Sequence, residues 1–481
     1  MVSTEGAPIG GLSAEQMREE SAHLAMPDEV ASPFGMLRFF DGVPLPETVT
    51  TLYDALDLVR GIDVFLNCMP AASLVALRRG FRSIGVTSPR VIAYCDPRSN
   101  SRNFALTANT ETTYATTFLD LKAWGPTVVE APPQSLCFVD DFWFGYVADM
   151  GMAGPDRGEG GKYLYLPPGY DGDVPDGYFT YRSPTYTNWL VIRALGGIGD
   201  ARKTRVYPLA EADAPAENEW VNWTDLAYNT VHANDLSFYR EVDEVIQEEP
   251  ADALDAERAG QLAAIGIVKG RPFEPDERRQ RILDQAARIA AGMARAVAYN
   301  PRDPDATLYG SWKAAFIGGS EKFLRDGARL LDARAQFFYI ATGITPAMAH
   351  AHVGTGSAYA YTAHDAHRDV LDGARGYRLH VDPDVPAQTF WAVDVYDTQT
   401  RSLLQIPSTI WPALSSRTGT LRANDDGSHD LYFGPTAPEG AESNWIETLP
   451  GKSWFAIVRI YGPLPPWFDQ TWRLNDIEPM T

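Results

Sequence analysis

The sequence predicts an α+β protein, mostly β, in which two jelly-roll-like antiparallel β-sandwich domains are joined by a helical region. At 481 residues the chain is long enough for more than one domain. Aromatic and β-branched runs broken by glycine and proline fill residues 101–209 and 342–481. Short strands without helices between them favour sandwiches over a parallel sheet. Between them, residues 210–341 show the apolar spacing of helices.

The first hundred residues divide into a polar leader, 1–34, and a helical segment, 35–100. In the second part apolar residues recur every three or four positions, for example at Leu52 and Leu56. Because proline interrupts a helix, Pro70 is expected to divide this segment into two helices.

The middle and C-terminal regions complete the predicted architecture. Ile282, Ile289 and Met293 lie on one face of a predicted helix within residues 210–341. These helices are expected to form a layer between the first β-domain and a second one over residues 342–481. The runs TFWAVDVYD and SWFAIVRIYG supply strands of that second domain.

Composition restricts the partners and the compartment of the protein. The chain has 63 acidic and 41 basic residues, a formal net charge of −22. Such a surface repels phosphate backbones and anionic lipids, so neither a nucleic acid nor a membrane is expected as a partner. Without a signal-peptide pattern or a run of about 18 apolar residues, the protein is expected to be cytoplasmic. No phosphate-binding loop or other cofactor motif is evident.

Several longer motifs resemble a known pair of bacterial domains. LTANTETTYATTFLDL, VDDFWFGYVADMG and YRSPTYTNW are similar to the domain of unknown function 1254, and VYDTQTRSLLQ and IYGPLPPWFD to its C-terminal companion, number 1214. The resemblance covers roughly residues 35 to 478. It implies two jelly-roll-like β-domains joined by helices, and it implies no particular reaction.

The stretch VDDFWFGYVADMG places two adjacent carboxylates in an apolar run. Because neighbouring side chains on a strand face opposite sides, Asp140 and Asp141 are not expected to act as one catalytic pair. A buried carboxylate needs a cation or several hydrogen-bond donors. Arg182 or Arg193 is the expected partner. A structural salt bridge and a role in acid–base chemistry both remain open for this pair.

The run LTANTETTYA offers a second candidate site. Asn109, Glu111 and Thr113 alternate along a strand and would face one cavity, with Tyr114 beside them. Glu111 would act as a general acid or base if apolar surroundings raised its pKa. A polar strand edge explains the same residues without any chemistry.

Histidines provide two further candidates. His232 precedes a predicted helix N-terminus and is either presented to a site or held as a structural hydrogen-bonding group. His350, His352, His364 and His367 lie within 18 residues. Pairs spaced by two or three residues share one face of a strand or turn, which suits a transition metal. Solvent-facing histidines without a metal are the alternative.

The leading interpretation is an enzyme that uses carboxylate acid–base catalysis for hydrolysis, hydration or isomerisation of a small polar, cyclic or aromatic molecule. The catalytic candidates are Glu111, Asp140, Asp141, Arg182 and His232. The substrate-binding candidates are Asn109, Tyr114, Trp143 and Trp189, because aromatic side chains line small-molecule pockets.

Three alternatives follow from the same residues. A carbohydrate-type β-sandwich would bind a ligand without turnover. A structural protein would assemble into a homo-oligomer. A metal-dependent enzyme would use His350, His352, His364 and His367.

Overall fold

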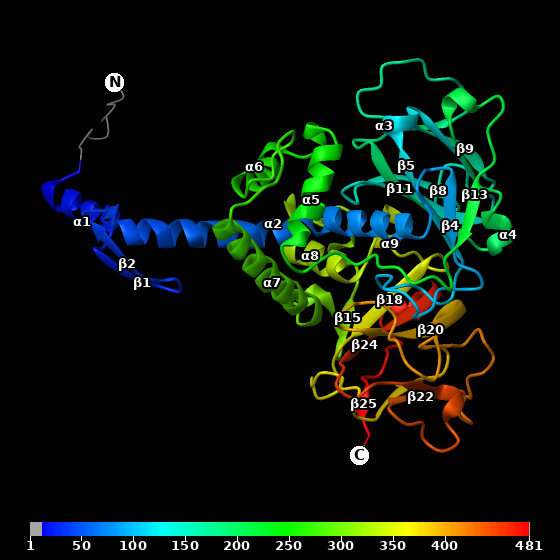
Figure 1. Ribbon diagram of the computed structural model, residues 1–481. Coiled ribbons are helices and arrows are strands. Elements are labelled where there is room, and N and C mark those ends of the chain that lie inside the picture. The colour runs from blue at the N-terminus through cyan, green and yellow to red at the C-terminus, as the bar shows by residue number, and fades with distance from the viewer. Residues whose placement is uncertain (1–11, 481) are drawn as a thin grey trace, which may run out of the picture.

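The computed structural model describes residues 12–480 and confirms the α+β class, with 29% helix and 28% strand. Two β-domains lie at the right of Figure 1, one above the other, and the helices lie beside and between them. Each β-domain contains one six-stranded and one four-stranded sheet.

An N-terminal arm projects away from this body (Figure 1). It contains α1 (Ala14–Leu24), β1 (Glu29–Ser32), β2 (Gly35–Phe40) and β3 (Val43–Pro44). Helix α1 has no buried residue, and Leu37 is the buried apolar side chain of the small sheet. The arm therefore adds little to the hydrophobic core among the described residues.

Helix α2 (Pro46–Ser83) is continuous, so the expected division at Pro70 is wrong. Pro70 is buried, with Met69 and Ala71 fully buried beside it, and this burial offsets the hydrogen bond that a proline removes, a cost of about 3 kcal/mol. The helix is long and apolar enough to cross a membrane. However, 67% of its most apolar window is buried inside the protein, as in a core helix.

The first β-domain is a sandwich of a six-stranded and a four-stranded sheet. Side chains from both sheets form one apolar cluster, including Val139 and Leu190 from one sheet and Val129 and Val206 from the other. The larger sheet has the order β13 (Glu219–Asn222), β4 (Val91–Tyr94), β5 (Tyr114–Asp120), β11 (Thr187–Ala194), β7 (Ser135–Asp141), β8 (Tyr146–Gly151). The smaller has the order β10 (Phe179–Arg182), β9 (Gly161–Leu166), β6 (Thr127–Ala131), β12 (Arg205–Pro208).

The second β-domain repeats this arrangement, with Trp454 and Tyr377 in the cluster between its sheets. The larger sheet has the order β14 (Thr307–Tyr309), β15 (Trp312–Ala314), β18 (Ser357–Thr362), β24 (Trp454–Pro463), β20 (Ala387–Asp397), β21 (Ala413–Ser415). The smaller has the order β23 (Trp445–Glu447), β22 (His429–Gly434), β19 (Tyr377–Val381), β25 (Glu478–Pro479). A separate hairpin pairs β16 (Leu324–Arg325) with β17 (Ala328–Arg329).

Helices cover the faces of the larger sheets that their sandwiches leave free. One apolar cluster joins α2, Trp189 and Val191 of the first domain, and Phe455 and Ile457 of the second. The other long helices are α5 (Ser237–Glu248), α6 (Ala256–Ala264), α7 (Glu277–Tyr299) and α8 (Leu331–Ile340). One-turn helices are α3 (Leu121–Trp124), α4 (Ile198–Ala201), α9 (Pro346–Ala349) and α10 (Pro465–Phe468). The helical layer therefore links the two β-domains, as the sequence predicted.

Small residues let α2 and α7 approach closely, which predicts opposite effects for two identical substitutions. A Cβ at Gly61 would lie 2.8 Å from the Ala286 Cβ, whereas a Cβ at the exposed Gly292 of α7 would meet nothing within 4 Å. Gly61→Ala should lower the free energy of unfolding by about 1–3 kcal/mol. Gly292→Ala should raise it by up to about 1 kcal/mol because alanine favours helix.

Urea unfolding of the two variants and of the wild-type protein measures both effects. Equal stabilisation by the two substitutions would show that α2 and α7 are not in tight contact at Gly61.

Candidate functional site

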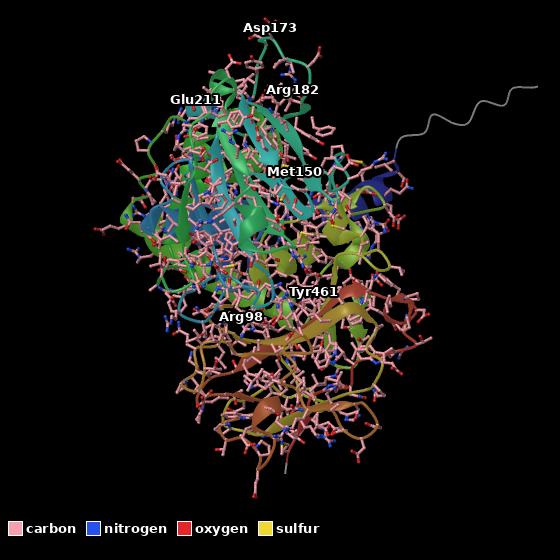
Figure 2. The ribbon with its side chains drawn as sticks, turned by 90° about the vertical axis from the view of Figure 1, so that its right-hand side faces the viewer. Arg98, Met150, Asp173, Arg182, Glu211 and Tyr461 are labelled. Carbon is pink, nitrogen blue, oxygen red and sulfur yellow. The ribbon has the colours of Figure 1, made fainter. Side chains whose placement is uncertain are left out.

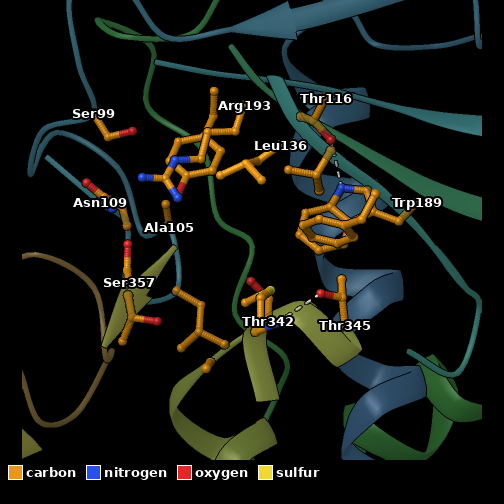
Figure 3. A pocket seen from close by; sticks show the side chains of 18 of the residues that line it. Ser99, Ala105, Asn109, Thr116, Leu136, Trp189, Arg193, Thr342, Thr345 and Ser357 are labelled. Atoms are coloured by element: carbon orange, nitrogen blue, oxygen red, sulfur yellow. Dashed lines mark hydrogen bonds between the residues drawn. The ribbon is translucent and has the colours of Figure 1, made fainter. Parts of the chain in front are cut away.

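An inner cavity of about 300 Å³ lies against the helical side of the first larger sheet. Its floor consists of side chains on one face of that sheet, because every second residue of a strand points the same way. Cross-strand pairing arranges them in rows: Tyr114, Arg193, Leu136 and Gly151 in one, then Thr116, Val191, Phe138 and Asp149 in the next. Trp189 lies beyond them on β11, and its indole donates to Thr116 Oγ1 at 2.7 Å (Figure 3).

The opposite wall comes from the segment after α8 and from the second β-domain. Tyr359, Ile457 and Arg459 of the second larger sheet line the cavity. Gly343 approaches the floor so closely that a Cβ there would lie 2.8 Å from Phe138 and 2.9 Å from Trp189. With φ at +72°, this position also favours glycine. The cavity is therefore enclosed by segments that are far apart in the chain.

A wider outer cleft of about 1180 Å³ adjoins the inner cavity between the two β-domains. Leu136, Arg193 and Gly356 line both spaces, so Arg193 stands at their boundary. The formally charged side chains along the cleft are three arginines and one glutamate: Arg98, Arg193, Arg417 and Glu111. In a protein with a net charge of −22, this cleft is locally cationic.

A buried ion pair fastens the two β-domains together beside the cavity. Arg459 on β24 pairs with Asp394 on β20, and both side chains are buried. Thr110 of the first domain donates to Asp394 Oδ1 at 2.6 Å, and Arg459 donates to the Thr107 carbonyl at 3.3 Å. Burial raises the pKa of Asp394, and the neighbouring Arg459 and Thr110 oppose that rise. The segment 107–111 is thus held by a charged pair that belongs to the second domain.

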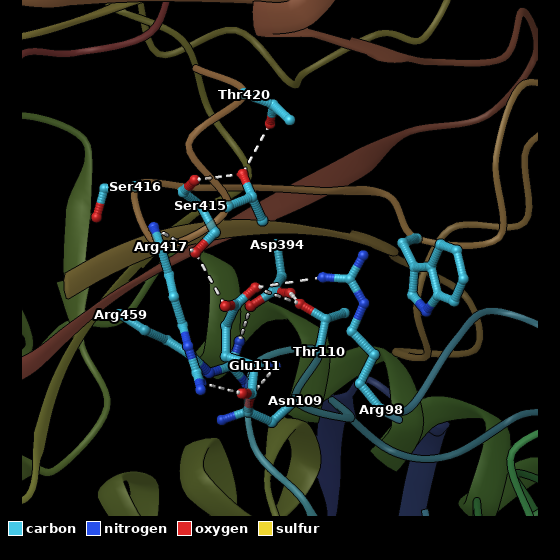
Figure 4. Close-up of polar contacts among 12 residues, drawn as sticks. Arg98, Asn109, Thr110, Glu111, Asp394, Ser415, Ser416, Arg417, Thr420 and Arg459 are labelled. Atoms are coloured by element: carbon cyan, nitrogen blue, oxygen red, sulfur yellow. Dashed lines mark hydrogen bonds and ion pairs between the residues drawn. The ribbon is translucent and has the colours of Figure 1, made fainter. Parts of the chain in front are cut away.

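Glu111 lies at the same junction between the two β-domains (Figure 4). Its Oε2 accepts from Ser415 at 2.9 Å, its Oε1 accepts from Thr110 at 3.2 Å, and Arg98 lies 4.0 Å away. Burial, and then the nearby charge of Asp394, raises the pKa of Glu111. Glu111 lines the outer cleft.

Asp149 is the carboxylate that lines the inner cavity. Burial raises the pKa of its side chain from 3.8 to about 7, although hydrogen bonds with Thr345 and Tyr146 oppose the rise. A carboxyl group with such a pKa exists in both protonation states near neutral pH. It is therefore suited to take up or release a proton.

Arg193 brings an uncompensated cation into the cavity. Its Nε is buried and has no hydrogen-bond partner among the described residues. The ionisable groups that affect it most are Tyr114, Tyr359, Tyr461 and Arg459, and no carboxylate is among them. Its guanidinium carbon lies 5.6 Å from the centre of the Tyr461 ring.

The carboxylates of the VDDFWF stretch have structural contacts. Asp140 Oδ2 accepts from the backbone N–H of Ile344 at 3.0 Å, which fastens the segment after α8 over the sheet. Burial raises the pKa of Asp140 well above its usual value. Asp141 Oδ1 accepts from the N–H groups of Trp143 and Gly145, both at 2.7 Å. Burial still raises the pKa of Asp141 to about 6.

The expected arginine partners of this pair are wrong. Arg182 is exposed and donates to the Tyr170 carbonyl at 2.6 Å. Figure 2 shows it far from Arg98 and Tyr461 at the domain junction. Arg193 forms no ion pair with either aspartate among residues 12–480.

The candidates for substrate binding are partly brought together. Asn109, Tyr114 and Trp189 line the inner cavity, where the Asn109 amide donates to the Tyr461 hydroxyl at 2.9 Å. Trp143 lines a separate pocket beside α5 and α6.

The structure places His232 in the apolar core. Its ring lies edge-on to Phe65 and Phe238, and Nδ1 donates to the Ala233 carbonyl at 2.9 Å. Burial lowers the pKa of His232 to about 3, so the ring is neutral at physiological pH. These contacts agree with the structural alternative.

The four clustered histidines do not converge on a metal site. His364 is buried, whereas His350, His352 and His367 are exposed. Across residues 12–480, no group of three His, Cys, Asp or Glu side chains is placed to hold a metal ion. The suggested metal ligands His350, His352, His364 and His367 are therefore wrong as a set. His352 instead lines the outer cleft.

Sequence reasoning missed Asp149, Asp394 and Arg459 as residues of this region. Asp149 lies inside the quoted VDDFWFGYVADMG stretch, and strand alternation could have marked it as a floor residue once β8 was recognised. The pair Asp394 and Arg459 is separated by 65 positions and carries no local signal.

Comparison with known proteins confirms the predicted resemblance. Residues 91–212 match the family model described as protein of unknown function (DUF1254), and residues 356–465 match protein of unknown function (DUF1214). No curated protein sequence matches the chain.

Two crystal structures match the chain at low sequence identity. The VPA0106 protein from Vibrio parahaemolyticus is 16% identical with a TM-score of 0.53, over 89% of this chain and 100% of that one. An uncharacterised protein from Burkholderia cenocepacia is 14% identical with a TM-score of 0.38, over 90% and 96% of the two chains. The first likeness supports the fold and carries no function.

The buried pair Asp394 and Arg459 should show strong coupling in a double-mutant cycle. Arg459→Met leaves Asp394 buried without its cation and should lower the free energy of unfolding by about 3–5 kcal/mol. Asp394→Asn combined with Arg459→Met should cost clearly less than the sum of the single changes. Strictly additive costs in urea unfolding would contradict a direct interaction.

Asp149 should also change how stability depends on pH. Its folded pKa of about 7 lies above the unfolded value of 3.8, so the native state retains the proton longer. This group therefore makes the protein less stable as pH rises from about 4 to about 7. Unfolding free energies of the wild-type protein and Asp149→Asn should diverge over that range. Parallel pH profiles would mean that Asp149 titrates normally.

Proposed function

We propose that this protein, which carries the two domains of unknown function 1254 and 1214, is an enzyme that performs acid–base chemistry on a small organic molecule in the inner cavity. One observation supports the proposal above all others. A carboxyl group with a pKa of about 7, Asp149, lines an otherwise mostly apolar cavity that is enclosed between two domains. Such groups concentrate where proton transfer takes place.

Asp149 would act as the general base. In its ionised form it would accept a proton from the bound molecule or from a water molecule beside it, and the protonated form would return that proton in a later step. Thr345 and Tyr146 lie beside the carboxylate, and the Tyr146 hydroxyl accepts from the Asp149 backbone N–H at 3.1 Å. The reactions that fit are hydrolysis, hydration and isomerisation, since each requires proton transfer.

The other carboxylates are less suited to this role. Glu111 is bound to Ser415 and Thr110 at the domain seam, and Asp140 holds the segment around Ile344. We therefore assign them to positioning the walls of the site.

A carbohydrate-binding protein without turnover is less well supported. Sugar recognition needs an accessible aromatic face, whereas Trp189 is 7% exposed. The rings of Phe138 and Phe144 lie edge-on to its indole, at 5.7 Å each. The indole therefore serves as part of a packed wall.

Isotope incorporation tests the proposal before the substrate is known. The protein would be incubated with a small-molecule extract of bacterial cells in water enriched in deuterium and oxygen-18, and labelled products identified by mass spectrometry. Wild-type protein should label at least one compound, at a rate that rises with pH through about 7 as Asp149 ionises. Asp149→Asn should slow labelling at least about 100-fold.

Asp171→Asn is the matched control, because Asp171 lies on an exposed loop of the first domain. This variant should label compounds at the wild-type rate. Labelling by Asp149→Asn at the wild-type rate would remove Asp149 from the mechanism. The absence of any label with the wild-type protein would favour a binding protein.

A further inference from the structure

The geometry points to a substrate class: we propose that the ligand is a monocarboxylate with an apolar ring-sized body, and that the Arg193 guanidinium binds its carboxylate. This inference rests on the proposed function for its reaction, but binding of the acid can be tested independently. Arg193 reaches the cavity from β11 at the point where the outer cleft and the inner cavity meet (Figure 3).

Arg193 differs from the other cation at this site. Arg459 is already paired with Asp394 and also donates to the Tyr396 hydroxyl at 2.7 Å. Arg193 has no such partner in the described part of the chain, and its Nε is buried. Arg193 is half-buried as a whole, and a cation partly removed from water without a counter-charge is destabilised, so an anionic ligand would supply the missing charge.

The surroundings favour a single negative charge. One guanidinium fork matches one planar carboxylate through two parallel hydrogen bonds. Tyr114 and Tyr359 lie close enough to Arg193 to affect its pKa, and their hydroxyl groups can donate to the same anion. A phosphate monoester carries up to two charges, and the second would have no cation of its own, since Arg459 is occupied.

The rest of the cavity favours an apolar body. Phe138, Trp189, Phe316 and Phe337 line it together with aliphatic side chains. Its volume of about 300 Å³ lies at the lower end of the range of small-molecule sites, ~300–1,000 Å³.

Sheet geometry also limits the length of the ligand. Asp149 lies two strands and two residues from Arg193, which corresponds to roughly 12 Å between their Cα atoms. Both side chains line the cavity. A ring with a one- or two-carbon side chain ending in the carboxylate would then bring its ring or adjacent carbon beside Asp149.

The outer cleft provides an approach for an anion. Arg98 and Arg417 line it and stack on Trp411 and Phe390, at 4.6 and 5.3 Å from the ring centres. These contacts keep both guanidinium groups beside the cleft. Against the net charge of the whole protein, a cationic entrance would draw acids toward Arg193 and repel competing cations.

Matched acids and amides test this inference by calorimetric titration. Phenylacetate and 3-phenylpropanoate should bind the wild-type protein, and phenylacetamide and 3-phenylpropanamide should bind at least about 10-fold more weakly, because they lack the charge. Arg193→Met should remove the preference for the acids. Arg193→Lys should keep the preference for acids over amides with weaker binding, because lysine retains the charge without the fork.

Arg182→Met is the control, because Arg182 is exposed on β10. This variant should bind the acids as tightly as the wild-type protein does. Urea unfolding of Arg193→Met should show that the fold is retained. Equal affinity for acid and amide, tighter binding of phenyl phosphate than of the acids, undiminished acid binding by Arg193→Met, or no acid binding at millimolar concentration would each overturn the inference.

The same titrations separate this inference from the proposed function. Asp149→Asn should still bind the acids, because it does not contact the carboxylate. Acid binding without labelling of any acid would support the substrate class and count against catalysis. Arg193-independent labelling of a neutral compound would support catalysis and count against the substrate class.

Discussion

The site depends on the ion pair between Asp394 and Arg459. Both residues belong to the second β-domain, and besides the bond from Arg459 to Tyr396 of the same domain they form hydrogen bonds with Thr110 and Thr107 of the first. A buried pair of this kind is stable only when its other lone pairs and protons are also satisfied. The segment 107–111 supplies two of these contacts, which hold the two domains in one relative position. The cavity walls, which come from both domains, are placed by the same contacts.

Given that relative position, ordinary strand alternation creates the chemistry of the cavity. One face of the first larger sheet packs its apolar side chains against its partner sheet. The opposite face carries Arg193, Asp149 and Trp189 among apolar neighbours, and the helices and second domain cover it incompletely. An enclosed apolar space raises the pKa of a carboxyl group, and it also buries the Nε–H of Arg193. The same cavity therefore accounts for the shifted pKa of Asp149 and for the unsatisfied Nε of Arg193.

The sequence predicted the elements better than their contacts. Strand texture and helical spacing indicated β-regions and a helical layer, although the stretch 210–341 that was predicted to be helical also contains β13 and β14–β17. Asn109 and Tyr114 of the LTANTETTYA run line the inner cavity, but residues 107–113 form no strand, and Glu111 and Thr113 line the outer cleft instead. Alternation also separated Asp140 from Asp141, but it could not show that Ile344, 204 positions away, would donate to one oxygen of Asp140. Pro70 misled because burial outweighed the local cost of proline. The histidine spacing gave a wrong prediction because His364 is buried whereas the other three histidines are exposed to solvent.

Ligand binding at Arg193 is expected to depend on how the two β-domains are arranged. Arg193 belongs to the first domain, whereas Tyr461 and Tyr359, which lie near it, belong to strands β24 and β18 of the second. An anion that bound Arg193 and also accepted hydrogen bonds from these two tyrosines would add an interaction between the two β-domains. By linkage, any ligand that binds this native arrangement stabilises it. Occupancy of the cavity and the close contact of the two β-domains should therefore increase together, with Arg459 supplying the fixed contact and Arg193 the ligand-dependent one.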